Sequence, residues 1–149
     1  MRFFLLSLPL LWIVLPEPLQ AEERIAVIVS ETSPVKDALS REELASIYRR
    51  KTLFWRNSTT IVPLNLPVTH PLRRSFSRTV LGESPEEMEA YWNTQYFHGI
   101  SPPYVLASEE AVVEFVATTP GAIGYVNATA VNGRAHVLLY LPFSSEKQP

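Results

Sequence analysis

The chain has 149 residues, a formal net charge of −2 at pH 7 and no cysteine. This length suits one domain, and a content of 46% hydrophobic and 19% charged residues is typical of a packed globular protein. The lack of cysteine excludes disulfides, thiolate metal sites and thiol nucleophiles. The near-neutral charge removes the basic surface expected of a nucleic-acid-binding protein, so we expect no nucleic acid among the partners.

The first 21 residues have the layout of a secretory signal peptide. Arg2 supplies a positive charge, residues 3–15 are almost all apolar, and Ala21 offers a small residue at the cleavage point. The alternative is an uncleaved membrane anchor, but the apolar run is shorter than the roughly 20 residues that a bilayer-spanning helix needs. We therefore expect a signal peptide over residues 1–21 and a mature periplasmic domain over residues 22–149, with no membrane span after cleavage.

The first half of the mature chain predicts two strands and one well-marked helix. Residues 25–29 form a continuous apolar run, as expected for a strand covered on both faces. Ser40 and Glu43 make a capping box at the start of a helix whose apolar face contains Leu44, Ile47 and Tyr48. Residues 61–64 predict a second strand, in which Pro63 should lie at an edge or a strand end because it lacks an N–H donor.

Two further helix starts follow. Residues 69–71 open a helix that ends at Gly82 and carries Leu72, Phe76 and Val80 on one side. Ser84 caps a third helix, with Pro85 in its first turn. We expect the buried face of this third helix to contain Met88, Tyr91, Trp92 and Gln95.

The remaining segments complete an alternating pattern. Residues 104–106 predict a short strand, Ser108 caps a fourth helix, and residues 122–126 and 137–140 predict two more strands. Strands that alternate with helices indicate an α/β fold with a mainly parallel sheet flanked by helices. We find no repeat or linker and expect one domain.

The residues that could support catalysis have simpler explanations. The three histidines lack metal-ligand spacing, so we expect no metal and no cofactor. Asp37 is the one aspartate and no Gly-x-Ser-x-Gly elbow exists, which disfavours a Ser-His-Asp hydrolase. The glutamate pairs 86–87 and 109–110 fall in first helical turns, and the cations 49–51 fall at a helix end, where the helix dipole favours each charge. For residues 49–51 a partner-binding patch remains open. We expect no enzyme.

The start of the second helix is the candidate ligand site. Thr69 and His70 follow a strand and a short loop, and a helix N-terminus gathers free N–H groups that suit an anion. Arg73 and Arg74 lie in the first turn, where they oppose the helix dipole unless an anion or an acidic partner compensates. Pro71 removes one donor, so a plain solvent-exposed helix start remains the alternative. The candidate ligand-binding residues are Thr69, His70, Arg73 and Arg74.

Two segments resemble the phosphate ABC-transporter substrate-binding proteins. Residues 39–51, followed by Phe54 and Trp55, look like the helix-then-tryptophan segment of that family. Residues 118–126, with the sequence TTPGAIGYV, are similar to its Thr-Pro-Gly-x-Ile-Gly-Tyr-Val signature. The resemblance implies a type II periplasmic-binding-protein fold, and a mature chain of this length suffices for a single lobe.

The same resemblance implies a phosphate clamp that this sequence lacks. The family places an Arg, an Asp and a Ser-Gly-Thr run after the second strand, and here Leu66, Val68 and residues 70–72 stand at those positions. Strong phosphate capture needs several converging donors. One hypothesis is therefore an exported protein that binds phosphate or another oxyanion weakly for ABC-type uptake or sensing, with a transporter or sensor as partner. The other is a non-catalytic interaction module that has lost ligand capture and binds a partner protein or a second copy of itself.

Overall fold

A five-stranded mixed sheet forms the frame of the molecule, and the computed structural model describes it over residues 23–145. The strand order is β3-β2-β4-β1-β5. The strands are β1 (Arg24–Ser30), β2 (Val62–Asn65), β3 (Tyr104–Val105), β4 (Ala122–Asn127) and β5 (Ala135–Pro142). The helices are α1 (Arg41–Tyr48), α2 (Pro71–Phe76), η1 (Ser77–Leu81), α3 (Glu89–Phe97), α4 (Glu109–Thr118) and η2 (Ala128–Ala130). The predicted signal peptide lies outside the described residues, so its cleavage stays a prediction.

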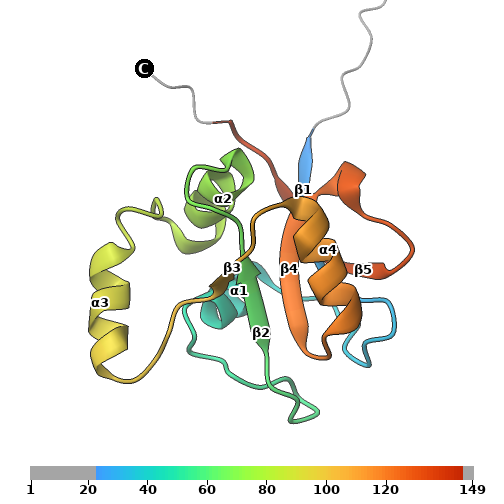
Figure 1. Cartoon of the computed structure of the whole chain (residues 1–149), viewed down its shortest axis with the longest axis horizontal. Helices are drawn as coiled ribbons and strands as arrows, with labels where there is room; N and C mark the ends of the chain where they lie inside the picture. Colours follow the sequence, from blue (N-terminus) through green and yellow to red (C-terminus); the bar gives the residue numbers. More distant parts are fainter. Residues whose placement is uncertain (1–22, 146–149) are drawn as a thin grey trace, which may run out of the picture.

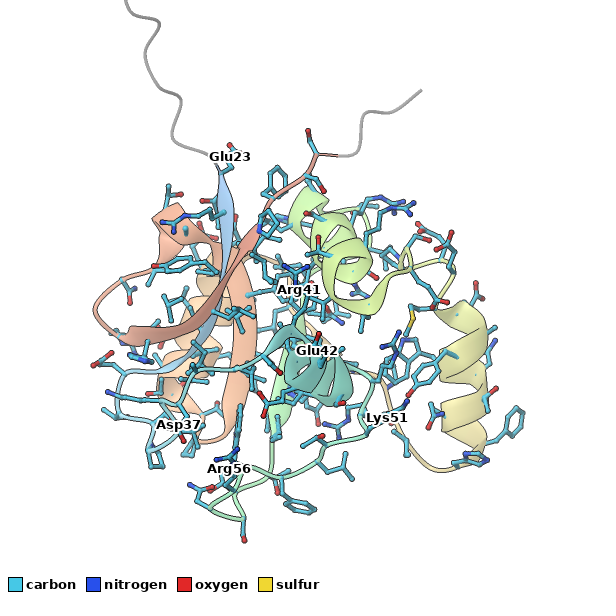
Figure 2. The ribbon with its side chains drawn as sticks, turned by 180° about the vertical axis from the view of Figure 1, so that it is seen from behind. Glu23, Asp37, Arg41, Glu42, Lys51 and Arg56 are labelled. Carbon is cyan, nitrogen blue, oxygen red and sulfur yellow. The ribbon has the colours of Figure 1, made fainter. Side chains whose placement is uncertain are left out.

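Helices cover both faces of the sheet. Helix α4 lies in front of β4 in Figure 1, and α1 lies in front of the sheet when the molecule is seen from behind in Figure 2. Residues Ile25 to Val29 of β1 are at most 1% exposed, because both faces of this strand are covered. The prediction of an α/β domain with a sheet flanked by helices is confirmed.

The expected parallel pairing holds for β2 and fails for β1. Strand β2 runs parallel to β3 and β4, whereas β1 is antiparallel to β4 and β5. The expectation of a parallel sheet assumes that each helix returns the chain to the end of the sheet at which the preceding strand began. The connection from β1 to β2 contains α1 and a long loop on each side of it, and it does not return the chain in this way. Because β1 is antiparallel to β4 and β2 is parallel to β4, the chain enters β2 from the end of the sheet at which β1 finishes.

Local signals for helix starts and strand edges are confirmed. The Ser40 N–H donates to Glu43 Oε2 at 2.8 Å and the Glu43 N–H donates to Ser40 Oγ at 3.1 Å. The hydrogen bond from the Ser40 backbone holds the pKa of the Glu43 carboxyl below its ordinary value. Strand β3 pairs only with the last two residues of β2, so Pro63 borders a free edge of the sheet, as expected.

The third helix begins later than its sequence signals suggest. The predicted capping box between Ser84 and Glu87 is present, with hydrogen bonds of 2.8 and 3.1 Å. Turns follow it, and α3 begins at Glu89. On the predicted buried face, Met88 is buried, whereas Tyr91, Trp92 and Gln95 are half-buried. Figure 1 shows that α3 stands beside the rest of the fold, and the Tyr91 hydroxyl reaches across to donate to the Arg49 carbonyl at 2.6 Å.

A buried aromatic cluster joins α1, α2 and β4. The rings of Phe76 and Tyr125 stack with centroids 3.9 Å apart, and Tyr48 meets Phe76 edge-on at 4.6 Å. The Tyr48 hydroxyl donates to the Leu64 carbonyl at 2.9 Å, and the Tyr125 hydroxyl donates to Asn65 Oδ1 at 2.7 Å. Both hydroxyls therefore attach the cluster to the end of β2.

Gly124 allows α4 to lie directly on β4. A Cβ atom at this position would lie 2.5 Å from Val112 Cγ1 and 3.4 Å from Val116 Cγ2, and both side chains belong to α4. Val112 is β-branched and has few alternative rotamers, so it has little freedom to move aside. Gly124 therefore permits a close approach to the strand, and the closest neighbour is a helix side chain.

We expect Gly124→Val to destabilise the domain by about 1–3 kcal/mol, because the added side chain forces α4 away from β4. The measurement is the urea unfolding midpoint and slope, compared with wild type. Gly133→Ala is the matched control, since no atom lies within 4 Å of a Cβ at Gly133. An unchanged midpoint for Gly124→Val would contradict the close packing.

Candidate functional site

The four candidate residues lie where the chain leaves β2 and enters α2. Thr69 is exposed, and His70, Arg73 and Arg74 are half-buried. Strands β2 and β4 are parallel, so their carboxyl ends meet at this end of the sheet, beside α2 (Figure 1). Ligands of open α/β sheets commonly bind outside the carboxyl ends of the strands. The fold therefore brings the four candidate residues to the end of the sheet at which ligands of such folds commonly bind.

His70 caps α2 with its own side chain. The Leu72 N–H donates to His70 Nδ1 at 3.1 Å, and the His70 N–H donates to the Pro67 carbonyl at 2.9 Å. Pro71 has no N–H, so these bonds use the backbone donors of residues 70–72. Two of the amides at this helix start, those of His70 and Leu72, are thus bound within the protein.

A carboxylate from α4 approaches the same place. Glu109 Oε1 accepts from the Asn127 N–H at 2.6 Å, and Glu109 Oε2 lies 4.0 Å from His70 Nε2. The sequence explains Glu109 by its position in a first helical turn and does not associate it with His70. No sequence signal links the two residues, because they are far apart in the chain and meet only when α4 packs on the sheet. Glu109 places a negative charge beside the candidate anion site.

Both arginines donate back to the loop that precedes them. Arg73 Nη1 donates to the Leu66 carbonyl at 2.9 Å, and Arg74 Nη1 lies 3.4 Å from the Val68 carbonyl. Arg74 Nη1 also pairs with Glu86 Oε1 at 2.7 Å. This hydrogen bond holds the pKa of the Glu86 carboxyl below its ordinary range. Carbonyl dipoles and an acidic side chain of the protein therefore compensate the charges that oppose the helix dipole.

The two apolar residues at the family's clamp positions have different surroundings. Leu66 is fully buried and belongs to the hydrophobic core, whereas Val68 is 48% exposed. Leu66 therefore contributes packing where a phosphate-binding protein of that family would present a charged side chain.

Three cavities of about 410, 310 and 210 Å³ open on the described part of the molecule, and none of them is lined by the four candidate residues. Between residues 23 and 145 no group of three His, Cys, Asp or Glu side chains could hold a metal ion. Over the same residues, every helix is too short or too polar to cross a bilayer.

The mixed sheet flanked by helices is a fold that this chain shares with solved structures of phosphate transport proteins. The chain is similar to an ABC-type phosphate transport receptor from Vibrio cholerae, with 20% identity and a TM-score of 0.65 over 79% of this chain and 46% of that one. It is also similar to PstS from Borrelia burgdorferi, with 18% identity and a TM-score of 0.61 over 79% of this chain and 47% of that one. No family model and no curated protein matches the chain.

These similarities establish the fold, and the chain spans about half the length of the solved structures that it matches. They confirm the resemblance in fold that the sequence motifs around residues 39–51 and 118–126 implied. A Clostridium perfringens protein whose structure holds phosphate shares the fold at 22% identity and a TM-score of 0.64, over 79% of this chain and 45% of that one.

We expect Arg74→Ala to raise the pKa of the Glu86 carboxyl toward its ordinary range, because the mutation removes the charged donor at 2.7 Å. A lowered native pKa stabilises the fold above the unfolded-state pKa, and this contribution is lost as the pH falls through the native pKa. Carboxyl carbon shifts in an NMR pH titration measure the change. Arg41→Ala, which alters an exposed cation on α1 (Figure 2), is the control and should leave Glu86 unchanged. Equal Glu86 pKa values in Arg74→Ala and wild type would refute the pairing.

Proposed function

We propose that the chain is an exported, non-catalytic binding protein that takes phosphate or a similar small oxyanion weakly, for ABC-type uptake or sensing. The observation that carries this proposal is the position of Arg73 and Arg74 at the carboxyl end of β2, in a fold shared with phosphate transport receptors. Thr69 and His70 would complete the contact with the anion. The expected partners are a transporter or a sensor in the periplasm.

The contacts around α2 favour weak binding. The His70 and Leu72 amides already have acceptors, and the Glu109 carboxylate lies near His70. Two half-buried arginines at a helix start supply about 1–3 kcal/mol of attraction after screening. A millimolar dissociation constant corresponds to about 4 kcal/mol of binding free energy. The attraction from the two arginines is smaller than this, so the binding is expected to be weak.

Titration calorimetry at low ionic strength tests the ligand. We expect the purified monomer to bind phosphate with a Kd no tighter than about 1 mM, and added salt to weaken the binding further. The Arg73→Ala/Arg74→Ala variant should lose phosphate binding. Arg56→Ala, which alters an exposed cation at the opposite end of the molecule from α2 in Figure 2, should retain it. A micromolar one-to-one isotherm from the monomer would overturn the weak site.

Export is tested separately. Expressed in a Gram-negative host, the chain should accumulate in the periplasmic fraction and be shorter by about 2 kDa, the mass of a signal peptide of this length. Intact mass spectrometry of the fractions measures both. The Leu10→Glu/Leu11→Glu variant breaks the apolar run and should keep the full-length protein in the cytoplasm. Wild-type protein of full mass in the cytoplasm of an export-competent host would contradict the signal peptide.

An interaction module is the second candidate, and exposed apolar side chains favour it. Tyr96 and Phe97 at the end of α3 are 74% and 85% exposed, and Tyr104 and Val105 of β3 are 66% and 58% exposed. Exposed apolar patches often mark protein–protein contacts. Light scattering separates the candidates: a mass that doubles with concentration and returns to the monomer in Phe97→Ser, without phosphate binding, would favour the module.

A further inference from the structure

A pocket lies at the opposite end of β2 from the candidate phosphate residues. Its volume is about 210 Å³, and it is lined by Arg50, residues 60–63 at the start of β2 and residues 101–104 at the start of β3. Arg50 is the one charged residue in this lining, and no carboxylate belongs to it. The lining thus carries one positive charge and no negative charge, and it includes Thr60 and Ser101 beside mainly apolar residues.

Arg50 occupies a backbone position that ordinarily belongs to glycine. Helix α1 ends in a Schellman motif: the Arg50 N–H donates to the Ile47 carbonyl at 3.0 Å, and the Lys51 N–H donates to the Ser46 carbonyl at 2.9 Å. This motif needs a left-handed residue, and Arg50 has a φ of 60°. Glycine adopts that conformation without the steric strain that a Cβ brings. The helix end therefore does not require an arginine side chain.

The protein supplies the hydrogen-bond donors of the Arg50 guanidinium with few acceptors. Its Nη1 is 3.4 Å from the Ile61 carbonyl, at the long limit for a hydrogen bond. Its Nε is shielded from water and has no acceptor. Arg50 forms no ion pair with any carboxylate among residues 23–145, although its side chain is half-buried. Buried donors and charges normally have partners, so a cation in this state suits an anionic ligand.

We propose that this pocket binds a small carboxylate that carries a compact apolar group. The planar fork of Arg50 matches a carboxylate, which it can bind through two parallel hydrogen bonds. Thr60 and Ser101 can donate hydroxyl hydrogens, and the rings of Pro102, Pro103 and Tyr104 suit an apolar body. Inorganic phosphate fits less well, because a dianion without apolar surface needs more cations and donors than this lining provides.

Benzoate is the probe, titrated into the exported protein while amide shifts are followed by NMR. We expect saturable shifts at Thr60, Val62, Ser101 and Tyr104. Benzamide, which has the same shape without the charge, should bind about tenfold more weakly or worse, since hydrogen bonds to a charged group are the stronger ones. Inorganic phosphate should not shift these amides, so the result is independent of the phosphate site around α2.

Arg50→Gly isolates the side chain without harming the helix end. We expect the unfolding midpoint to stay equal or rise, and the benzoate affinity to fall about tenfold or more. Lys51→Gln is the matched control, because Lys51 carries the same charge one residue away, is exposed and does not line the pocket (Figure 2). Arg50→Gln repeats the test with a residue of similar length.

Equal benzoate affinity in wild type and both Arg50 variants would overturn the proposal. An equal loss of benzoate affinity in Lys51→Gln would also overturn it, because that would indicate general charge attraction. Amide shifts that never saturate, or that lie away from the pocket, would overturn it as well. Saturable shifts at the pocket that the two Arg50 variants lose and Lys51→Gln keeps would establish it.

Discussion

The hydrogen bonds of two buried tyrosines to the end of β2 are the constraint on which the candidate site depends. Tyr48 comes from α1 and Tyr125 from β4, and their hydroxyls bind the Leu64 carbonyl and the Asn65 side chain. Burial raises the pKa of both phenols well above the ordinary value, so they stay neutral donors at physiological pH. The last residues of β2 are thereby fixed to elements on either side. The loop that leads to α2 starts from this fixed point.

The arginines at the two ends of β2 differ in how many hydrogen-bond acceptors the protein gives them. At the carboxyl end of β2, Arg73 and Arg74 donate to carbonyls of their own loop, and Arg74 also pairs with Glu86. At the other end of β2, Arg50 has one long hydrogen bond and a buried Nε without an acceptor. A cation already compensated by the protein gains little from an anion, whereas an uncompensated one gains more. The arginines at the carboxyl end of β2, where the family resemblance places the ligand, are therefore better supplied with acceptors than Arg50 is.

The sheet topology separates these two places. Because β2 and β4 are parallel, α2 and the start of α4 meet at one end of the sheet, and this brings Glu109 close to His70. The free edge of β2 beside Pro63 lies at the other end, where the residues before β3 close the pocket around Arg50. One strand of four residues thus has a different kind of polar site at each end.

The sequence by itself determined the features that depend on neighbours a few residues apart. The capping boxes at Ser40 and Ser84, the left-handed end at Gly82 and the apolar helix faces all follow from interactions over one helical turn. Those signals were sufficient for the α/β class and for placing residues 69–74 at a helix start. The signature over residues 118–126 also indicated the fold that the solved structures share with this chain.

Only the tertiary structure decided the features that join distant segments. The antiparallel placement of β1 depends on the end of the sheet at which the chain enters β2, and the pairing of Arg74 depends on Glu86 reaching it from the next segment. Glu109 reaches His70 because α4 packs on the sheet, and Arg50 lacks an acceptor because of what surrounds it in three dimensions. Such contacts arise from packing between elements whose separation along the chain leaves no periodic or spacing signal. Sequence spacing therefore located the charged residues, and packing determined which of them remain available to a ligand.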